Sequence, residues 1–174
     1  MIQKSSAWLV FGAFARSPTK AFHIRELSRI LDLAPTSINL HLKELEKNKL
    51  IVQDKTGLYT SYKANFDSEE FRFYKKIHNL IELKESDLIE EIEDKLFPTA
   101  IVLFGSYMKG EDIETSDVDL FLIAEKKSIN LSRYEKQLSR KIQLYFSDDI
   151  NKLPRELKNN ILNGIVISGF LKVF

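Results

Sequence analysis

Hydrophobic residues in the first 65 positions recur first at helical and then at strand spacing. Residues 5–16 predict a helix, with Ser5 or Ser6 as its N-cap and the Ser17-Pro18 pair ending it. A second helix follows in the segment IRELSRILDL, and the sequence Ala34-Pro35-Thr36 breaks it and opens a third. The third helix has an apolar stripe at i, i+4 and i+7, formed by Ile38, Leu42 and Leu45.

Strand signals lie within this helical region and after it. Residues 21–24 predict a short extended piece between the first two helices. Residues 50–54 and 59–63 flank the turn Lys55-Thr56-Gly57, which predicts a β-hairpin. The front of the chain therefore reads as helix, strand, helix-turn-helix and hairpin.

The middle of the chain, from residue 67 to residue 95, contains no Gly or Pro. Ile77, Ile81, Leu88 and Ile92 fall near helical spacing with charged residues between them, which predicts one or two amphipathic helices. The acidic run at residues 90–94 is most simply a solvated helix face. Pro98 marks a domain boundary, so residues 66–97 are expected to be a helical connector that can pair with a second copy.

The sharpest chemical signal follows Pro98. The apolar run at residues 100–104 predicts a buried strand that ends in Gly105-Ser106. Ten residues separate Ser106 from Asp117-Val118-Asp119, which leads into a second apolar run. Alternate residues of a strand share a face, so Asp117 and Asp119 point the same way and repel each other. A divalent cation between them removes that repulsion, and carboxylate oxygens suit Mg²⁺. Gly105 allows close approach of a phosphate, to which Ser106 can donate.

This pattern, GSYMKGEDIETSDVDLFLI, resembles the signature of the polymerase-beta-type nucleotidyltransferase superfamily, and most of all its minimal nucleotidyltransferases. The resemblance covers roughly residues 97–174, including a closing helix at residues 156–163. It implies that Gly105 and Ser106 hold a nucleoside triphosphate and that Asp117 and Asp119 are catalytic and bind Mg²⁺. Lys109 stands where relatives often have Arg and can still pair with phosphate. The alternative is a strand-leading turn in which Asp and Ser cap the backbone.

A third carboxylate is the point at which the sequence departs from the family. Members usually carry another Asp on a later strand, and the alternation of residues 140–146 puts Gln143 at that place. Gln is a neutral ligand and no general base. Asp148 and Asp149 follow, but a shift to them would exceed the strand and change side-chain direction. Enzymatic activity is therefore left open by the sequence.

The front of the chain has a resemblance of its own. The segment LSRILDLAPTSINLHLKELEKNKLI, with the hairpin after it, resembles the winged helix-turn-helix of bacterial and archaeal transcriptional regulators over about 65 residues. In such proteins the second helix of the motif enters the major groove of double-stranded DNA and the wing lies near phosphates. Leu40 stands at a position that is often basic in relatives, and an interaction or dimerisation module is the alternative. The resemblance implies these DNA-contacting residues: Thr36, Ser37, Asn39, His41, Lys43 and, on the wing, Lys55.

The net charge is informative only when it is counted for each segment separately. The whole chain has a net charge of +1, yet residues 1–65 carry +5, residues 66–97 carry −5 and residues 98–174 carry +1. The neutral total therefore hides a basic front end, which permits DNA binding. A composition of 44% hydrophobic residues without Cys argues against disorder and a disulfide scaffold. The apolar stretch at residues 8–15 is too short to span a bilayer, so a cytoplasmic protein without a membrane partner is the expectation.

Together these patterns predict an α+β chain of three parts. They are a winged helix-turn-helix at 1–65, a helical connector at 66–97, and a small mixed-sheet nucleotidyltransferase-like domain at 98–174. The expected function is DNA binding joined to Mg²⁺-dependent transfer of a nucleoside monophosphate to a protein or small-molecule hydroxyl. Similar minimal domains include antitoxins that adenylylate a partner toxin, which makes a toxin a candidate partner. A regulator with a catalytically silent domain that binds only nucleotide or a partner protein is the competing hypothesis, and a purely structural dimer is the third.

Overall fold

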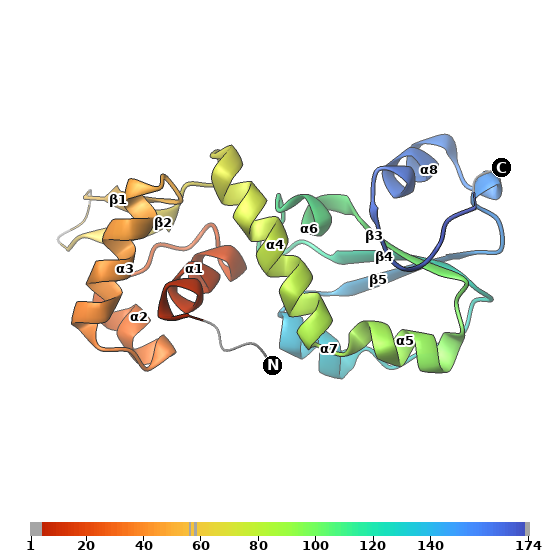
Figure 1. Cartoon of the computed structure of the whole chain (residues 1–174), viewed down its shortest axis with the longest axis horizontal. Coiled ribbons are helices and arrows are strands. Elements are labelled where there is room, and N and C mark those ends of the chain that lie inside the picture. Colours follow the sequence, from red (N-terminus) through yellow and green to blue (C-terminus); the bar gives the residue numbers. More distant parts are fainter. Residues whose placement is uncertain (1–4, 56, 58, 173–174) are drawn as a thin grey trace. The chain divides into compact units, whose positions relative to one another are not determined.

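The computed structural model describes residues 5–55, residue 57 and residues 59–172. The chain divides into two compact units, Met1–His78 and Asn79–Phe174, and Figure 1 shows the elements of each. No helix in the described part of the chain is both long enough and apolar enough to cross a bilayer.

Three complete helices lie in the first unit, and the sequence predicted all three, the first from its cap and its Ser17-Pro18 end and the other two from apolar spacing. They are α1 (Ser6–Arg16), α2 (Ile24–Leu31) and α3 (Pro35–Lys47). The Ser5 hydroxyl caps α1 by accepting from the Trp8 amide at 3.3 Å. Helix α2 ends where Asp32 adopts a left-handed conformation, and Pro35 occupies the first turn of α3, where its missing N–H costs nothing.

A two-stranded hairpin completes this unit. Strands β1 (Ile51–Asp54) and β2 (Ser61–Ala64) pair antiparallel, as the strand signals predicted. Phe22, in the piece expected to be extended, forms a bridge to Tyr62, with backbone N···O distances of 2.8 and 2.9 Å. Within the predicted turn, Thr56 lies outside the described residues. Apolar side chains from all three helices and both strands form one core, which includes Phe14, Leu27, Ile38, Leu42 and Ile51.

The middle of the chain forms two helices, α4 (Glu69–Glu85) and α5 (Leu88–Leu96). The division between the two units falls inside α4, after His78. In the first unit Phe71 is buried and the Lys75 ammonium donates to the Ala15 carbonyl at 2.6 Å. Helix α5, which the sequence assigned to a connector, packs its apolar face into the core of the second unit. The acidic run predicted to be a solvated face is so only in part, because Asp94 is exposed whereas Glu90, Glu91 and Glu93 are half-buried. Glu91 forms an ion pair with Lys95 at 2.5 Å.

The second unit is built on a four-stranded mixed sheet of order β5-β4-β3-β6. The strands are β3 (Ala100–Phe104), β4 (Val118–Ile123), β5 (Ile142–Ser147) and β6 (Ile165–Gly169). Strand β3 pairs antiparallel with β4 and with β6, whereas β4 and β5 are parallel. The small mixed sheet expected for this part of an α+β chain is therefore present.

Helices cover both faces of this sheet, as Figure 1 shows. Helices α5 and α7 (Ser132–Leu138) pack on one face, and α8 (Arg155–Leu162) packs on the other. Two short helical segments, α6 (Gly105–Lys109) and the 3-10 turn η1 (Ile150–Lys152), follow β3 and β5. Helix α8 lies one residue earlier than the closing helix predicted at residues 156–163. Every residue of β3 is buried, which explains its continuous apolar run.

Candidate active site

The turn from β3 into α6 brings Gly105 against the carboxylate of Asp119. Gly105 has φ +78°, a conformation that side chains disfavour, and a Cβ placed on it would lie 2.4 Å from Asp119 Oδ2. The register of the sheet explains this approach, because Phe104 is the partner of Asp119 across β3 and β4. Only glycine leaves room here for a carboxylate beside the first residue of α6.

Asp117 and Asp119 form a close acidic pair at the start of β4. Asp117 immediately precedes the strand, Asp119 is its second residue, and both side chains are half-buried. Burial raises the pKa of the Asp119 carboxyl above its usual value, and the negative charge of Asp117 raises it further. The charge of Asp117 therefore reaches Asp119. A divalent cation would relieve both effects, so the donor set fits Mg²⁺ in charge and in oxygen chemistry.

The other residues assigned to nucleotide binding lie on α6. Ser106 is the second residue of this helix and is half-buried, next to the Gly105 turn. Lys109 is exposed at its last turn, before Gly110 ends the helix in a left-handed conformation. Both residues lie within four positions of Gly105 on one short helix, and Lys109 is free to reach a solvent-exposed phosphate.

Gln143 lies beside Asp119. The parallel pairing of β4 and β5 makes Gln143 the register partner of Asp119, so both side chains stand on the same face of the sheet. The described residues include no cluster of three His, Cys, Asp or Glu side chains able to hold a metal ion. Gln143 can offer an amide oxygen to a cation but cannot accept a proton as a base.

The two later carboxylates lie at the far end of β5. Asp148 and Asp149 follow the last residue of the strand, Ser147, roughly 16 Å from Gln143 at the usual rise per residue. Asp148 forms an exposed ion pair with Lys152 at 2.5 Å, and the Asp149 carboxylate caps the 3-10 turn that follows. Asp148 and Asp149 therefore do not replace the missing third carboxylate, in line with the expectation that they lie beyond the strand.

Tyr145 is a member of this site that sequence reasoning missed. Its hydroxyl hydrogen-bonds the Asp119 carboxylate, an interaction that lowers the pKa of Asp119 against the effect of burial. Its ring packs on Phe104, with centroids 5.3 Å apart and planes at 61°. Burial, followed by the charge of Asp119, raises the pKa of the Tyr145 hydroxyl, which keeps it a donor. The signal was available in the alternation of β5, since Tyr145 lies two residues beyond Gln143 and so on the same face.

A glycine turn, one carboxylate on the adjacent strand, a second just before that strand and a short helix between them have oxygen and backbone chemistry of the kind that suits a metal-bound phosphate group. Residues 86–169 match the family described as Polymerase beta, Nucleotidyltransferase. The match covers the whole sheet, both aspartates and Gln143, and it supports a nucleotidyltransferase domain at the level of the family. Neither a curated protein nor a solved structure matches the chain significantly.

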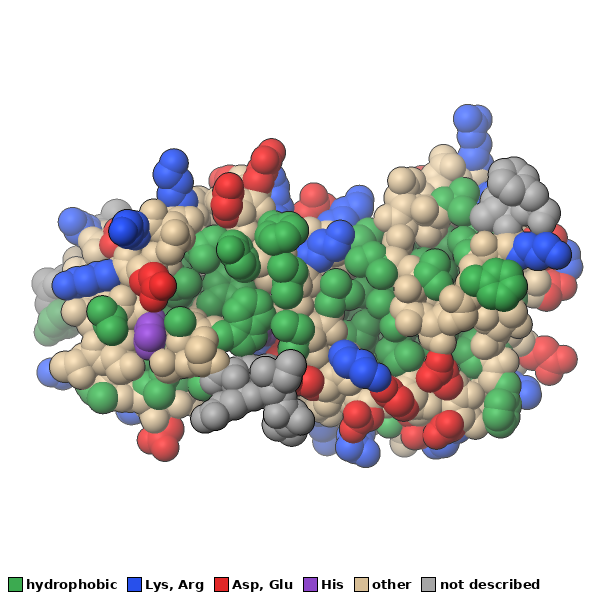
Figure 2. Space-filling model, viewed as in Figure 1, with side chains coloured by type: hydrophobic (Ala, Val, Ile, Leu, Met, Phe, Trp, Pro, Cys, Tyr) green, Lys and Arg blue, Asp and Glu red, His purple; other side chains and the backbone are tan. Residues whose placement is uncertain are grey.

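The residues assigned to DNA lie in the first unit on α3 and on the hairpin. Thr36, Lys43 and Lys55 are exposed, whereas Ser37 and Asn39 are partly buried. The side chain of His41 is only 14% exposed, and its Nε2 lies 2.7 Å from the Ser6 hydroxyl of α1. Figure 2 shows basic side chains on the visible surface of this unit with a few acidic ones among them.

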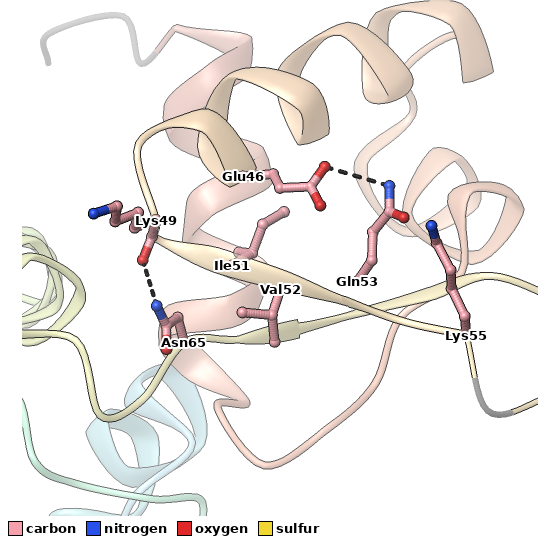
Figure 3. A pocket seen from close by; sticks show the side chains of 7 residues that line it. All are labelled: Glu46, Lys49, Ile51, Val52, Gln53, Lys55 and Asn65. Carbon is pink, nitrogen blue, oxygen red and sulfur yellow. Dashed lines mark hydrogen bonds between the residues drawn. The ribbon is translucent and has the colours of Figure 1, made fainter.

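A hollow of about 430 Å³ lies between the end of α3 and β1. Figure 3 shows the side chains that line it, with Lys55 at one end and Lys49 at the other. Gln53 donates to the Glu46 carboxylate at 3.3 Å, and Asn65 donates to the Lys49 carbonyl at 2.8 Å (Figure 3). These bonds join β1 to the end of α3, and the residue after β2 to the turn between α3 and β1. Its lining residues are Glu46, Lys49, Ile51, Val52, Gln53, Lys55 and Asn65.

Proposed function

We propose that the second unit transfers a nucleoside monophosphate from a nucleoside triphosphate to a hydroxyl group of a protein or small molecule. One observation carries this proposal. Asp119 lies against the Gly105 turn and feels the charge of Asp117, within a region that matches the nucleotidyltransferase family. That arrangement pairs a cation site with a backbone turn suited to a phosphate.

Each residue of the site has a chemical task under this proposal. Asp117 and Asp119 hold Mg²⁺, which supplies charge neutralisation for the phosphates when it is bound. The Gly105 turn and Ser106 hold phosphate oxygens, and Lys109 adds a positive charge. The acceptor hydroxyl attacks the α-phosphorus, the bond from that phosphorus to the bridging oxygen breaks, and pyrophosphate leaves. Gln143 orients the acceptor or the metal but takes no proton, so the acceptor's proton passes to solvent or to a group that the acceptor brings.

A second candidate function follows from Gln143 itself. The amide at this position removes the group that would complete the metal site or activate the acceptor. A domain of this kind can bind a nucleotide with one Mg²⁺ and report its presence without turning it over. The two candidates share Gly105, Asp117 and Asp119 and differ only in whether labelled product forms.

We further propose that the first unit is a winged helix-turn-helix that binds double-stranded DNA through α3 and Lys55. The order of α1, α2, α3, β1 and β2 and the exposure of Thr36, Lys43 and Lys55 support this role. His41 would hold α3 against α1 through its contact with Ser6. Of the residues assigned to DNA, it is the one that the structure favours least as a base contact. We also propose that the acceptor is a toxin-like protein, that the chain forms a homodimer, and that the protein is cytoplasmic.

The deciding experiment incubates the full chain with α-labelled ATP, Mg²⁺ and candidate acceptor proteins. Labelling of an acceptor is expected, and an Asp117→Ala/Asp119→Ala variant should lose it. Asp148→Ala is the matched control, because this exposed carboxylate lies at the far end of β5. Binding of ATP without any labelled product would favour the sensor instead. Equal labelling by the double variant would refute the site assignment.

A further inference from the structure

A buried polar network lies next to the site in the chain, and none of its members is among the residues assigned to the nucleotide or the metal. Asn79, Tyr107, Asp112 and Arg140 are each at most 6% exposed. They come from α4, α6, the loop after α6 and the residues just before β5. The network therefore joins four separate parts of the second unit around the segment that leads to Asp117.

Asn79 is the centre of this network. Its side-chain amide donates one hydrogen to Asp112 Oδ1 at 2.7 Å and the other to the Tyr107 carbonyl at 2.9 Å. The Tyr107 hydroxyl donates in return to the Asn79 carbonyl at 3.2 Å. Both donors of the amide are used, and they bind both the helix that begins at Gly105 and the loop that follows it.

Arg140 completes the other side of Asp112. Its Nε and Nη2 atoms donate to Asp112 Oδ2 at 3.3 and 3.1 Å, and Nη1 donates to the Ser139 carbonyl at 3.0 Å. A buried carboxylate is costly unless its oxygens are satisfied, and here each oxygen has a partner. Asp112 is thereby held between α4 and the start of β5.

Hydrogen bonds also hold the residues between Asp112 and Asp117. The Ser116 hydroxyl accepts from the Ile113 amide at 3.0 Å, and the Ser116 amide donates to the Ile113 carbonyl at 3.0 Å. Val118 then joins the sheet by donating to the Lys141 carbonyl at 2.8 Å. Asp117 thus lies between two fixed points, a closed turn anchored at Asp112 and the first residue of β4.

We propose that Asn79 is a positioning residue for the proposed nucleotidyl-transfer site. Through Asp112 it fixes the loop that carries Asp117, and through Tyr107 it fixes the short helix that begins at Gly105. This inference rests on the proposed function for its chemical meaning. A shift of about 1 Å in such a site can reduce a rate by roughly 100-fold, so a residue without substrate contact can control it.

The test compares Asn79→Leu with Leu83→Ala in the full chain. Leu replaces Asn without a donor, whereas Leu83 is a buried residue of the same helix that packs in the apolar core. The first readout is the Kd for α,β-methylene ATP in the presence of Mn²⁺. It is measured without urea, at a temperature at which both variants are folded. Asn79→Leu should raise this Kd at least about tenfold, and Leu83→Ala should leave it within about twofold. Similar Kd values for wild type and Asn79→Leu would overturn the proposal.

A second readout does not need the nucleotide. Amide hydrogen exchange of residues 111–117 should be at least about tenfold faster in Asn79→Leu than in wild type, and unchanged in Leu83→Ala. If wild type binds no nucleotide, the proposed function fails, and this exchange rate alone decides whether Asn79 fixes the loop. Unchanged exchange would then refute the positioning role as well. Should Asn79→Leu not fold, Asn79→Ser, which retains one donor, replaces it with the same expected direction and a smaller change.

Discussion

Gln143 is the register partner of Asp119 on the adjoining parallel strand, so an amide stands beside a half-buried carboxylate whose pKa is raised. The family resemblance places a third carboxylate at this position. Three carboxylates around one point repel one another until a metal binds, whereas two carboxylates and an amide carry less charge and hold a cation less strongly. Gln143 is therefore the residue that separates the transferase from the sensor.

Gln143→Asp should convert a weak or silent site into a more active one. The new carboxylate can bind metal and accept the acceptor's proton, for which general-base catalysis contributes about 100- to 10,000-fold. Product formation from α-labelled ATP would measure the gain. Gln143→Asn, which keeps the amide, is the control and should show no gain. An aspartate variant no faster than wild type would indicate that another group already takes this role.

Asp119→Asn should reduce Mg²⁺-dependent transfer by at least about 100-fold, because the side chain loses the charge that neutralises the metal. Removal of Mg²⁺ with EDTA should lower the wild-type rate to the level of this variant. Steady-state labelling with and without the chelator is the measurement. Asp148→Asn should retain the wild-type rate, since its exposed carboxylate pairs with Lys152 at the far end of β5. A variant that keeps its metal dependence would contradict the assignment.

Gly105→Ala should lower both stability and activity, although it adds only one methyl group. An alanine at φ +78° costs about 1–2 kcal/mol, and its Cβ would meet Asp119 Oδ2 at 2.4 Å, so the carboxylate must move. The free energy of unfolding in urea and the Mg²⁺-dependent labelling rate should both fall. Gly57→Ala is the control, because among the described residues the nearest atom that its added Cβ would meet is the Tyr59 carbonyl oxygen, at an ordinary contact distance of 3.7 Å. Loss of function in both variants alike would point to a general effect of alanine.

Arg140→Met should destabilise the second unit by about 3–5 kcal/mol, because it leaves the fully buried Asp112 carboxylate without its charged partner. Urea unfolding followed by far-UV circular dichroism would measure the change. A double replacement, Arg140→Met with Asp112→Leu, should recover much of the lost stability, since it removes the buried charge as well. Full stability in the single variant would mean that water reaches Asp112.

Lys43→Ala with Lys55→Ala should weaken DNA binding and its salt dependence together. Each lysine that contacts a phosphate contributes about −0.9 to the slope of log K against log salt, so the slope should become shallower by about 1.8. Fluorescence anisotropy with a labelled duplex from the protein's own promoter, over a salt series, is the measurement. Lys126→Ala with Lys127→Ala, in an exposed segment of the second unit, is the control. A binding constant independent of salt would leave the first unit as a protein-binding module.

Much of this protein was determined by the sequence alone, because the information is local. The stripe of Ile38, Leu42 and Leu45 predicted α3, and the continuous apolar run of β3 predicted a buried strand. Both are local patterns, and no distant contact is needed to read them. The place of Gln143 beside the acidic pair came from the family resemblance, to which the alternation of β5 added only the residue number.

The tertiary structure decided what distant segments do to one another. Asn79, on a helix read as a connector, lies against Tyr107 and Asp112, and Arg140 reaches the same carboxylate from just before β5. No spacing in the sequence indicates such a network, because Asn79 is 28 residues from Tyr107, Arg140 is 28 residues from Asp112, and each alone is an ordinary polar side chain. The reason that Gly105 must be glycine also comes from tertiary contact, since the atom that excludes a Cβ belongs to Asp119 on the next strand. Periodicity determined the elements, and only packing determined which polar groups they bury together.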